Sequence, residues 1–232
     1  MNYQIIQNES ELDRFLSILP DTKSNEKYYL ALFCRKKYDT ENLGIKCDKQ
    51  QLKRFLASKG DIKSKIRQLE CKIGCYTYDG IPIPNNMLSL YIMPTPRDLD
   101  LATRKSLIKF ANIIAERRPD NQEFHNPYKE VINQIQTSKS ETLFMDFDFD
   151  ICERPNINGI VNNDAVHMVK TRGGWHILVE VGKVSTEFKK TFYQNLKKLG
   201  ADVSGDCLLP CPGTIQGGFI PYMENDFISR PN

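Results

Sequence analysis

The sequence lacks any long apolar run, since nothing in it approaches the roughly 18 consecutive apolar residues that a transmembrane helix needs. Its first residues, MNYQIIQNESELDRF, also lack the basic and apolar segments of a secretory signal. We therefore expect a protein of the cytoplasm without a membrane partner. Internal repeats and low-complexity tracts are missing too, and ordinary contents of 40% hydrophobic and 26% charged residues argue against disordered, collagen-like and coiled-coil chains.

Cysteine pairs of the Cys-x-x-Cys type are also absent. Cys71-x-x-x-Cys75 and Cys207-x-x-x-Cys211 have only a loose metal-ligand spacing and no histidine partner at a fitting distance, so we do not expect a structural zinc site. The seven cysteines form an odd number without secretory context, which favours reduced thiols. A charge bias is missing as well: 32 Lys and Arg against 29 Asp and Glu leave a net charge of +3, so any basic surface must be local.

A chain of 232 residues is long enough for one large domain or two small ones. The order of its apolar patterns predicts an α+β fold in which helices pack on sheets. We expect an N-terminal α/β lobe over residues 1–115, a linker over 116–140 and a second lobe over 141–232.

The first half alternates between helical and strand patterns. Leu12, Phe15, Leu16 and Leu19 predict a helix that ends at Pro20. Strands are expected at Tyr28–Cys34 and Leu88–Met93, and helical patterns at Leu52/Phe55/Leu56, at Ile62/Ile66/Leu69 and in a helix that turns Leu107, Phe110, Ala111 and Ile114 inward. The stretch Arg117–Tyr128 is typical of a loop.

The second half has a different order of elements. Strands are expected at Thr142–Ile151, Val166–Lys170 and Trp175–Val181, followed by a helix from near Ser185 to Gly200. A segment rich in Pro and Gly begins at Leu208.

The segment Met145–Ile151, MDFDFDI, alternates acids with apolar residues. On a strand this alternation places Asp146, Asp148 and Asp150 on one face and the two phenylalanines on the other. Side chains two residues apart lie about 7 Å from each other, so two of these carboxylates can share a divalent cation, and without one they repel each other. The other interpretation is a half-exposed strand whose polar face is Asp, a residue that is uncommon inside strands.

A glycine turn between two strands carries cationic residues, in the segment KTRGGWH at 170–176. Gly173 and Gly174 permit a turn with positive φ and expose backbone N–H groups. Lys170 and Arg172 are cations that pair with phosphate, and the ring of His176 can donate a hydrogen bond. These residues predict a triphosphate cradle. A plain β-hairpin with a partly buried histidine is the alternative.

Two further acids follow the second lobe's helix. Asp202 could join the sheet as another carboxylate, whereas Asp206 comes after Gly205, where a turn is equally natural. Either acid could be a turn residue. The segment Pro210–Phe219 contains too much Pro and Gly for a helix, and its backbone could approach a ligand closely.

Together these segments resemble the motifs of the archaeo-eukaryotic primase superfamily, which includes the primase-polymerases. Those motifs are an acidic pair separated by one hydrophobic residue, a small residue two positions before a histidine, and a hydrophobic residue followed by an acid. The matching segments are Asp146-Phe147-Asp148, Gly174-Trp175-His176 and Asp202, followed by a Pro-Gly-Thr at 212–214 like that of the primase-polymerases. The resemblance covers about residues 141–219. Gly174 departs from it, since the family often has Ser there, and the third acid could be Asp206.

The resemblance implies a DNA primase or primase-polymerase, which joins nucleotides on a single-stranded DNA template or a primer-template. It implies an RRM-like second lobe, with the active site in the cleft between the lobes. Two Mg²⁺ or Mn²⁺ ions would be held by Asp146 and Asp148, with Asp202 or Asp206 as the third carboxylate. The incoming NTP or dNTP would be held by Lys170, Arg172, Gly173, Gly174 and His176. With no helicase-like domain in the sequence, a helicase or other replication protein on a separate chain is a candidate partner.

Two other functions stay open. Carboxylates and a histidine also build metal-dependent nucleases, although a nuclease does not need the cations beside the glycine turn. A catalytically silent nucleic-acid-binding module is the second alternative.

Basic and aromatic residues of the first lobe are candidates for contacts with nucleic acid. Arg35, Lys36, Lys37 and Arg97 could bind the template or primer backbone, or form a solvated charged face. Tyr28, Tyr29 and Tyr91 could stack on bases, although packing in the core is the more common role.

Overall fold

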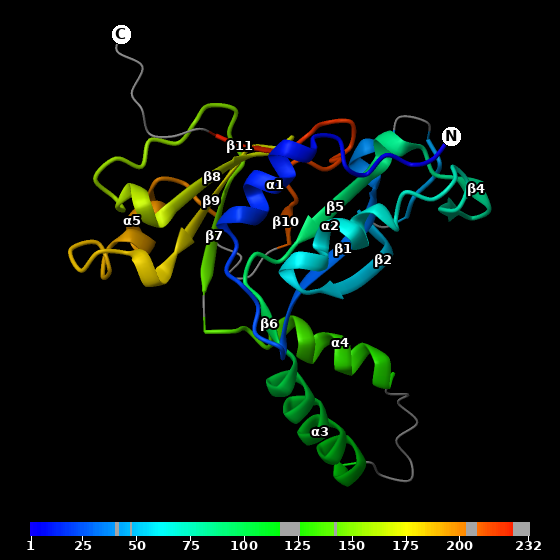
Figure 1. The fold of residues 1–232 in the computed structure, drawn as a ribbon, viewed down its shortest axis with the longest axis horizontal. Coiled ribbons are helices and arrows are strands. Elements are labelled where there is room, and N and C mark those ends of the chain that lie inside the picture. Colours follow the sequence, from blue (N-terminus) through cyan, green and yellow to red (C-terminus); the bar gives the residue numbers. More distant parts are fainter. Residues whose placement is uncertain (40–41, 47, 117–125, 142, 203–207, 225–232) are drawn as a thin grey trace.

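The computed structural model describes residues 1–39, 42–46, 48–116, 126–141, 143–202 and 208–224. In these residues helices pack against antiparallel sheets, which confirms the α+β class (Figure 1). No helix in the described part of the chain is long and apolar enough to cross a membrane. The α-helices are α1 (Glu9–Ile18), α2 (Ile62–Arg67), α3 (Leu99–Glu116), α4 (Pro127–Thr137) and α5 (Phe192–Lys198).

The larger sheet has the strand order β10-β5-β1-β2, and β6 also pairs with β1. All of its pairings are antiparallel. Its central strand, β1, is buried except for the half-buried Lys27, because neighbouring strands and helices cover it on all sides. Its strands are β1 (Glu26–Arg35), β2 (Lys49–Ala57), β5 (Leu88–Ile92), β6 (Arg97–Asp98) and β10 (Leu209–Pro210).

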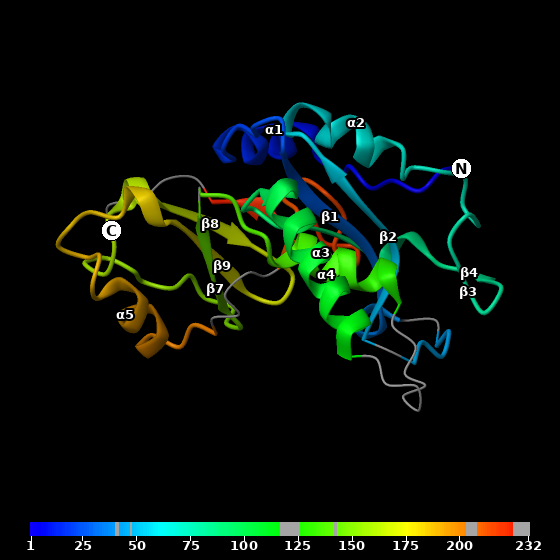
Figure 2. The ribbon, with the colours of Figure 1, turned by 90° about the horizontal axis from the view of Figure 1, so that it is seen from below.

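Helices cover both faces of the larger sheet (Figure 2). Leu12 of α1, Ile62 of α2 and Leu30 of β1 belong to one buried core. Tyr29 of β1 points to the opposite face and belongs to a separate core, against which Ile135 of α4 packs. The strict alternation of side chains along β1 therefore supplies two cores from one strand.

The smaller sheet has the strand order β11-β8-β9-β7 and is also antiparallel. Phe147 and Phe149 pack with α5 in the core on one face. The opposite face carries Phe144 and Leu178, which belong to the core shared with the larger sheet. The acids of β7 therefore lie on the face that is turned toward the larger sheet. The strands are β7 (Phe144–Phe149), β8 (Val166–Lys170), β9 (Trp175–Glu180) and β11 (Tyr222–Met223).

The remaining elements are short. A two-stranded hairpin and several single turns of 3-10 helix connect the larger elements. They are β3 (Thr77–Tyr78), β4 (Ile81–Pro82), η1 (Lys36–Tyr38), η2 (Lys59–Asp61), η3 (Asn85–Met87), η4 (Asn163–Ala165) and η5 (Val181–Lys183).

The C-terminal segment joins both sheets. Its residues Leu209–Pro210 pair with β5 of the larger sheet, and Tyr222–Met223 pair with β8 of the smaller one. The sequence-based range 141–232 for the second lobe therefore includes a strand of the larger sheet, because sequence proximity does not decide which sheet a short strand joins.

One helix expected from the sequence is wrong. The pattern Leu52/Phe55/Leu56 lies in β2, which pairs along the edge of β1 with a register shift between Leu32 and Phe33. Three apolar residues fit either period in so short a segment, and pairing with β1 decides between them.

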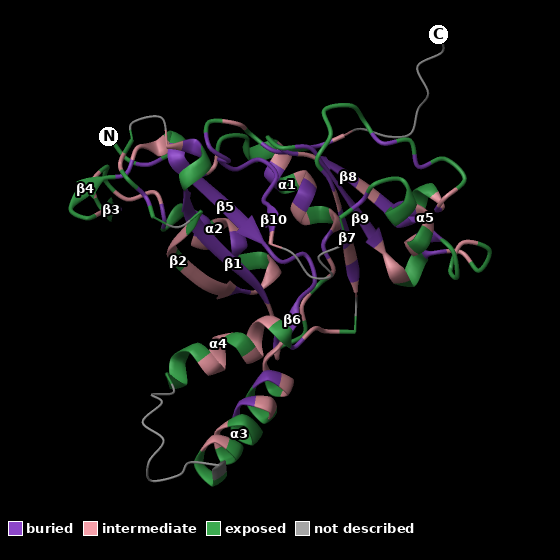
Figure 3. Ribbon diagram, turned by 180° about the vertical axis from the view of Figure 1, so that it is seen from behind, coloured by how far each residue is buried: buried purple, intermediate pink, exposed green. Residues whose placement is uncertain are grey.

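Part of the segment expected to be a linker is helical. The range 116–140 contains α4, which packs against α3, and the two helices project from the sheets. Most of the loop expected at Arg117–Tyr128, residues 117–125, lies outside the described residues. Leu107 and Ile114 of α3, expected to face inward, are 64% and 75% exposed. The start of α3 is buried at Ala102 and Ser106, while much of its remaining surface is exposed in Figure 3. The apolar residues of α3 do recur at helical spacing, but most of them lie where neither sheet packs against the helix.

The last helix is shorter than its pattern. The expected start near Ser185 is a series of turns, and α5 begins at Phe192. Its end agrees with the expectation, because Gly200 adopts a φ of +103° directly after the C-cap Leu199.

Candidate functional site

Three chain segments bring acids and a histidine together on one face of the smaller sheet. Asp148 of β7 lies opposite His176 of β9 in the strand register. On the other edge of β7, Asp148 and Asp202 form an isolated antiparallel bridge. Residues opposite each other in such pairs point to the same face. Asp146, two residues before Asp148, shares this face.

His176 lies between two of the carboxylates. Its Nδ1 is 2.9 Å and 3.0 Å from the two carboxylate oxygens of Asp146, and its Nε2 is 3.5 Å from Oδ1 of Asp148. Asp146 and His176 are buried, whereas the Asp148 side chain is 47% exposed. Asp146 therefore orients the imidazole, and Asp148 presents its carboxylate to solvent.

The charges in this cluster act on one another. Burial raises the pKa of Asp148, and the neighbouring carboxylates of Asp146, Asp150 and Asp202 raise it further, against the lowering effect of His176. Burial would lower the pKa of His176, but Asp146, with Asp148, outweighs burial and the pKa is raised. The cluster thus concentrates negative charge that a cation stabilises.

Asp202 is part of the sheet, as the sequence allowed. Its N–H donates to the carbonyl of Asp148 at 2.8 Å, and it accepts from the N–H of Asp148 at 2.9 Å. Asp206, the other candidate for the third acid, lies outside the described residues. Asp150 is exposed directly after β7 and attracts the ammonium of Lys37.

The glycine turn between β8 and β9 packs closely against the end of β7. The N–H of Thr171 donates to the carbonyl of Gly174 at 3.0 Å, and neither glycine has the positive φ expected for it. A Cβ on Gly174 would lie 1.9 Å from the carbonyl oxygen of Phe149. The backbone of β7 therefore leaves no room for a side chain at position 174. On Gly173 a Cβ would meet only Oδ1 of Asp150, at 3.8 Å.

Lys170 does not join the acidic cluster. It lies opposite Trp175 in the register, on the face of the sheet away from His176. Its ammonium lies 4.8 Å from the centre of the Trp175 ring and donates to the carbonyl of Cys152 at 3.2 Å. This cation is therefore held on the wrong face for the predicted cradle.

Arg172 instead reaches toward the larger sheet. Its guanidinium stacks 4.3 Å from the ring centre of Tyr38 and donates to the carbonyl of Gly217. Its backbone N–H donates to Oε1 of Gln216 at 2.8 Å. The turn thereby connects the smaller sheet to η1, which directly follows β1.

Tyr38 and Tyr91 are surrounded by four cations, a group that we name the basic-aromatic cluster. Arg35 lies 5.9 Å from the ring centre of Tyr38 and 5.7 Å from that of Tyr91. Burial lowers the pKa of Lys37, and the nearby Arg35 lowers it further. The set comprises Arg35, Lys37, Lys49, Arg172, Tyr38 and Tyr91.

This cluster is not predictable as a unit from the sequence. Arg35 and Lys37 lie far from Arg172 along the chain, and their convergence depends on how the two sheets pack. The available signal was Tyr38 directly after Arg35-Lys36-Lys37, a basic run that ends in an aromatic residue.

Some basic residues expected on the surface are structural. Arg97 is fully buried and donates to the carbonyl of Gln136 at 2.8 Å. Arg35 is buried and pairs with Asp48 at 2.9 Å, whereas Lys36 and Lys37 are exposed. The more common role expected for the tyrosines, packing in the core, is confirmed: all of Tyr28, Tyr29 and Tyr91 are buried.

The Pro-Gly-Thr segment at 212–214 makes structural contacts at the start of α1. The carbonyl of Gly213 accepts from the N–H groups of Gln7 and Asn8 at the start of α1, both at 2.9 Å. A Cβ on Gly217 would lie 2.2 Å from the ring of Tyr38, where φ is +61°. The sequence predicts that this backbone approaches a ligand closely, whereas in the structure it closely approaches α1 and Tyr38.

Within the described residues, no group of three or more His, Cys, Asp or Glu side chains is arranged so that it could hold a metal ion. The carboxylates of the cluster are nevertheless the oxygen ligands that Mg²⁺ and Mn²⁺ favour. A scan against protein-family models found no match, and neither did searches of curated proteins and of solved structures. The function is therefore inferred from the chain's own residues.

Proposed function

We propose that the protein is a metal-dependent, template-directed nucleotidyltransferase of the primase or primase-polymerase type. The observation that carries this proposal is the convergence of Asp146, Asp148, Asp202 and His176 on one face of a sheet. These residues come from three separate segments, and they are the acidic and histidine positions of the motifs quoted above. A chance arrangement of turn residues would not bring all three segments to one strand.

The strand order of the smaller sheet supports an RRM-like lobe. In space the order is β11, β8, β9, β7 and then the segment of Asp202, and the short strand β11 is an addition to the four positions of an RRM. Numbered along the chain, the other four have the order two-three-one-four of the RRM, and α5 precedes the last segment as a helix does there. One departure is that the described residues between β7 and β8 form only η4 and no α-helix.

The carboxylates supply the donor set for divalent cations. The Asp148 side chain is 47% exposed, and Asp202, its neighbour across the bridge, is exposed as well. Asp146 must turn at least one oxygen from His176 to take part, because both of its oxygens lie within 3.0 Å of Nδ1. When bound, divalent ions would lower the pKa of the attacking hydroxyl and stabilise charge on the leaving pyrophosphate.

The basic-aromatic cluster supports a site for the incoming NTP or dNTP. Four cations lie around two rings, and of these Arg35 pairs with Asp48. An anion between the cations would reduce the repulsion that remains among them. The attraction between Lys37 and Asp150 connects this cluster to the acidic strand. We assign Arg172 and His176 to the triphosphate and leave Lys170 out, because Lys170 is held over Trp175.

Single-stranded DNA is the proposed template. Of the four first-lobe residues considered for its backbone, Arg35 and Arg97 are buried, and Lys36 and Lys37 are exposed. Lys37 already belongs to the basic-aromatic cluster, so Lys36 is the candidate that we retain for contacts with the backbone.

The test is an incorporation assay on unprimed single-stranded DNA, with labelled NTPs or dNTPs and either Mg²⁺ or Mn²⁺. Wild type is compared with an Asp146→Asn/Asp148→Asn double variant, which keeps the side-chain shapes and removes both charges. New product from wild type alone supports the proposal. Cutting of the DNA without nucleotides, lost in the variant, identifies a nuclease instead. The absence of both activities from folded wild-type protein contradicts nucleotidyl transfer.

A further inference from the structure

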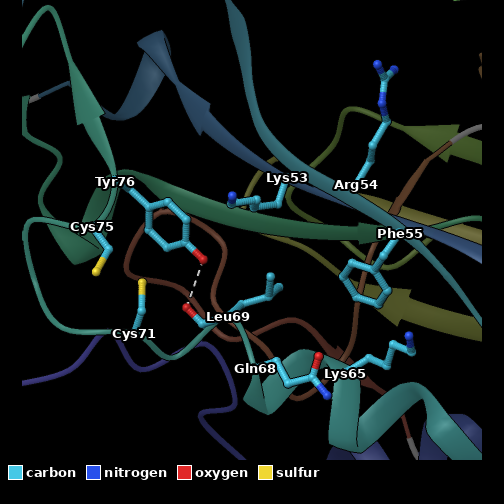
Figure 4. A pocket seen from close by; sticks show the side chains of 9 residues that line it. All are labelled: Lys53, Arg54, Phe55, Lys65, Gln68, Leu69, Cys71, Cys75 and Tyr76. Carbon is cyan, nitrogen blue, oxygen red and sulfur yellow. Dashed lines mark hydrogen bonds between the residues drawn. The ribbon is translucent and has the colours of Figure 1, made fainter. Parts of the chain in front are cut away.

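A cavity of about 440 Å³ lies between β2, α2 and the turn at residues 71–76, away from the acidic cluster (Figure 4). We propose that it binds a nucleoside monophosphate, with Lys53 and Lys65 pairing with the phosphate and Phe55 contacting the base. This inference is independent of the proposed function.

The charge of the cavity is the first argument. Its lining contains cations and no carboxylate. Within the described residues, neither Lys53 nor Lys65 makes an ion pair or a side-chain hydrogen bond. Lys63, also on α2, pairs with Asp13 at 2.8 Å. Of these two lysines of α2, Lys63 is therefore neutralised by an acid of α1, whereas Lys65 lies beside the cavity.

Arg54 lines the same cavity but is already engaged. Its guanidinium stacks 4.6 Å from the ring centre of Tyr128 of α4, and its Nε donates to the hydroxyl of Tyr128 at 3.1 Å. In Figure 4 its side chain points away from Lys53 and Lys65. Lys53 and Lys65 are therefore the cations left for the phosphate. In Figure 4 the Lys53 ammonium points toward Tyr76 and that of Lys65 lies beside Phe55, so their flexible side chains must rotate toward each other to pair with one phosphate.

Aromatic surface is the second argument. Phe55 is half-buried, and its ring lies beside Lys65 in Figure 4. Tyr76 is buried, and its hydroxyl donates to the carbonyl of Leu69 at 2.9 Å, which fixes the ring. A ligand with an anionic end and a flat apolar end fits this lining, and the volume lies in the range of about 300–1,000 Å³ typical of small-molecule sites.

Cys75 provides a reporter at the rim. It is exposed, and its thiol interacts with the half-buried thiol of Cys71. A neutral reagent such as iodoacetamide alkylates Cys75 without being attracted by the lysines. Peptide mass spectrometry then measures alkylation of this cysteine separately from all others.

The experiment measures the alkylation rate of Cys75 with AMP, inorganic phosphate or adenosine present. When AMP is raised to about ten times its dissociation constant, we expect the rate to fall about tenfold. Inorganic phosphate should protect less, and adenosine not at all. Protection should vanish in Lys53→Ala/Lys65→Ala and persist in Lys53→Arg/Lys65→Arg and in the neighbouring control Lys72→Ala.

Three results would overturn the inference. They are no protection of the wild type by AMP, protection that survives in a folded Lys53→Ala/Lys65→Ala variant, and equal protection by AMP and by either phosphate or adenosine alone. Thermal unfolding verifies that the variants are folded. Because no nucleotidyl transfer is measured, failure here leaves the proposed function untouched, and failure of the incorporation assay leaves this inference untouched.

Discussion

Asp148 and Asp202 exchange both backbone hydrogen bonds, at 2.9 Å and 2.8 Å, although 54 positions separate them in the sequence. This exchange adds the Asp202 segment to the edge of β7 and places its side chain beside the first acidic pair. The exchange places Asp202 in the sheet, whereas Asp206, the other acid considered from the sequence, lies outside the described residues.

The first prediction compares these two acids. Asp202→Asn should lower the rate of nucleotide incorporation by about 10²-fold or more, the size of effect expected when a group that stabilises transition-state charge is lost. Asp206→Asn should leave the rate close to that of wild type. Single-turnover incorporation measures both. A large loss in Asp206→Asn with little loss in Asp202→Asn would show that the wrong acid is assigned.

The second prediction concerns the fit of the glycine turn against β7. Gly174→Ala should lower the free energy of unfolding by about 1–3 kcal/mol, because its Cβ would collide with the carbonyl oxygen of Phe149. Gly182→Ala is the matched control, since a Cβ there meets nothing within 4 Å. Urea denaturation measures both changes. Equal stability of the two variants would mean that the turn can move away from β7.

The third prediction concerns the titration of His176. Its pKa is raised because Asp146 and Asp148 outweigh burial. Asp146→Asn removes the larger of these charges, so the pKa should fall. Since the folded pKa lies above the unfolded one, the pair stabilises the fold fully below the ordinary pKa of about 6.5, and this stabilisation is lost as pH rises through the folded pKa.

NMR titration of the imidazole protons checks this third prediction. His167 is an internal comparison, because burial lowers its pKa and no aspartate contributes. An unchanged titration of His176 in Asp146→Asn would contradict the assigned contact.

The fourth prediction contrasts two cations of one turn. Arg172→Ala should raise the KM for NTP about tenfold or more, as expected for the loss of a charged hydrogen bond to phosphate. Lys170→Met should leave this KM within about twofold, because the ammonium of Lys170 lies over Trp175 on the other face. Arg172→Lys should rescue only in part, since an ammonium does not stack on Tyr38 as a guanidinium does. A larger rise in KM for Lys170→Met than for Arg172→Ala would contradict this assignment and would support a triphosphate cradle that includes Lys170.

Local patterns were sufficient to predict the strands of the site. The alternation of acids and phenylalanines sent Phe147 and Phe149 into the core, and β8 has the bounds expected from its sequence. These features depend on a period of two within one strand, which the residues themselves carry.

Features that depend on long-range packing were not predictable. The pattern in β2 fits a helix as well as a strand, and pairing with β1 decides for the strand. The separation of Lys170 from His176 depends on the register between β8 and β9, which pairs Lys170 with Trp175. Tyr38 and Arg172, which are 134 positions apart in the sequence, meet only because the two sheets pack together. The sequence therefore identifies the cations but does not predict which of them lie together in the fold.

The most direct test of the central claim is whether the template dictates the product. Wild-type protein is supplied with all four labelled nucleotides on oligo(dT) and, separately, on oligo(dC), with Mn²⁺ or Mg²⁺. The account predicts adenine nucleotides in the product on oligo(dT), guanine nucleotides on oligo(dC), and neither product from Asp146→Asn/Asp148→Asn. Incorporation that ignores the template, or none from folded protein, would contradict it.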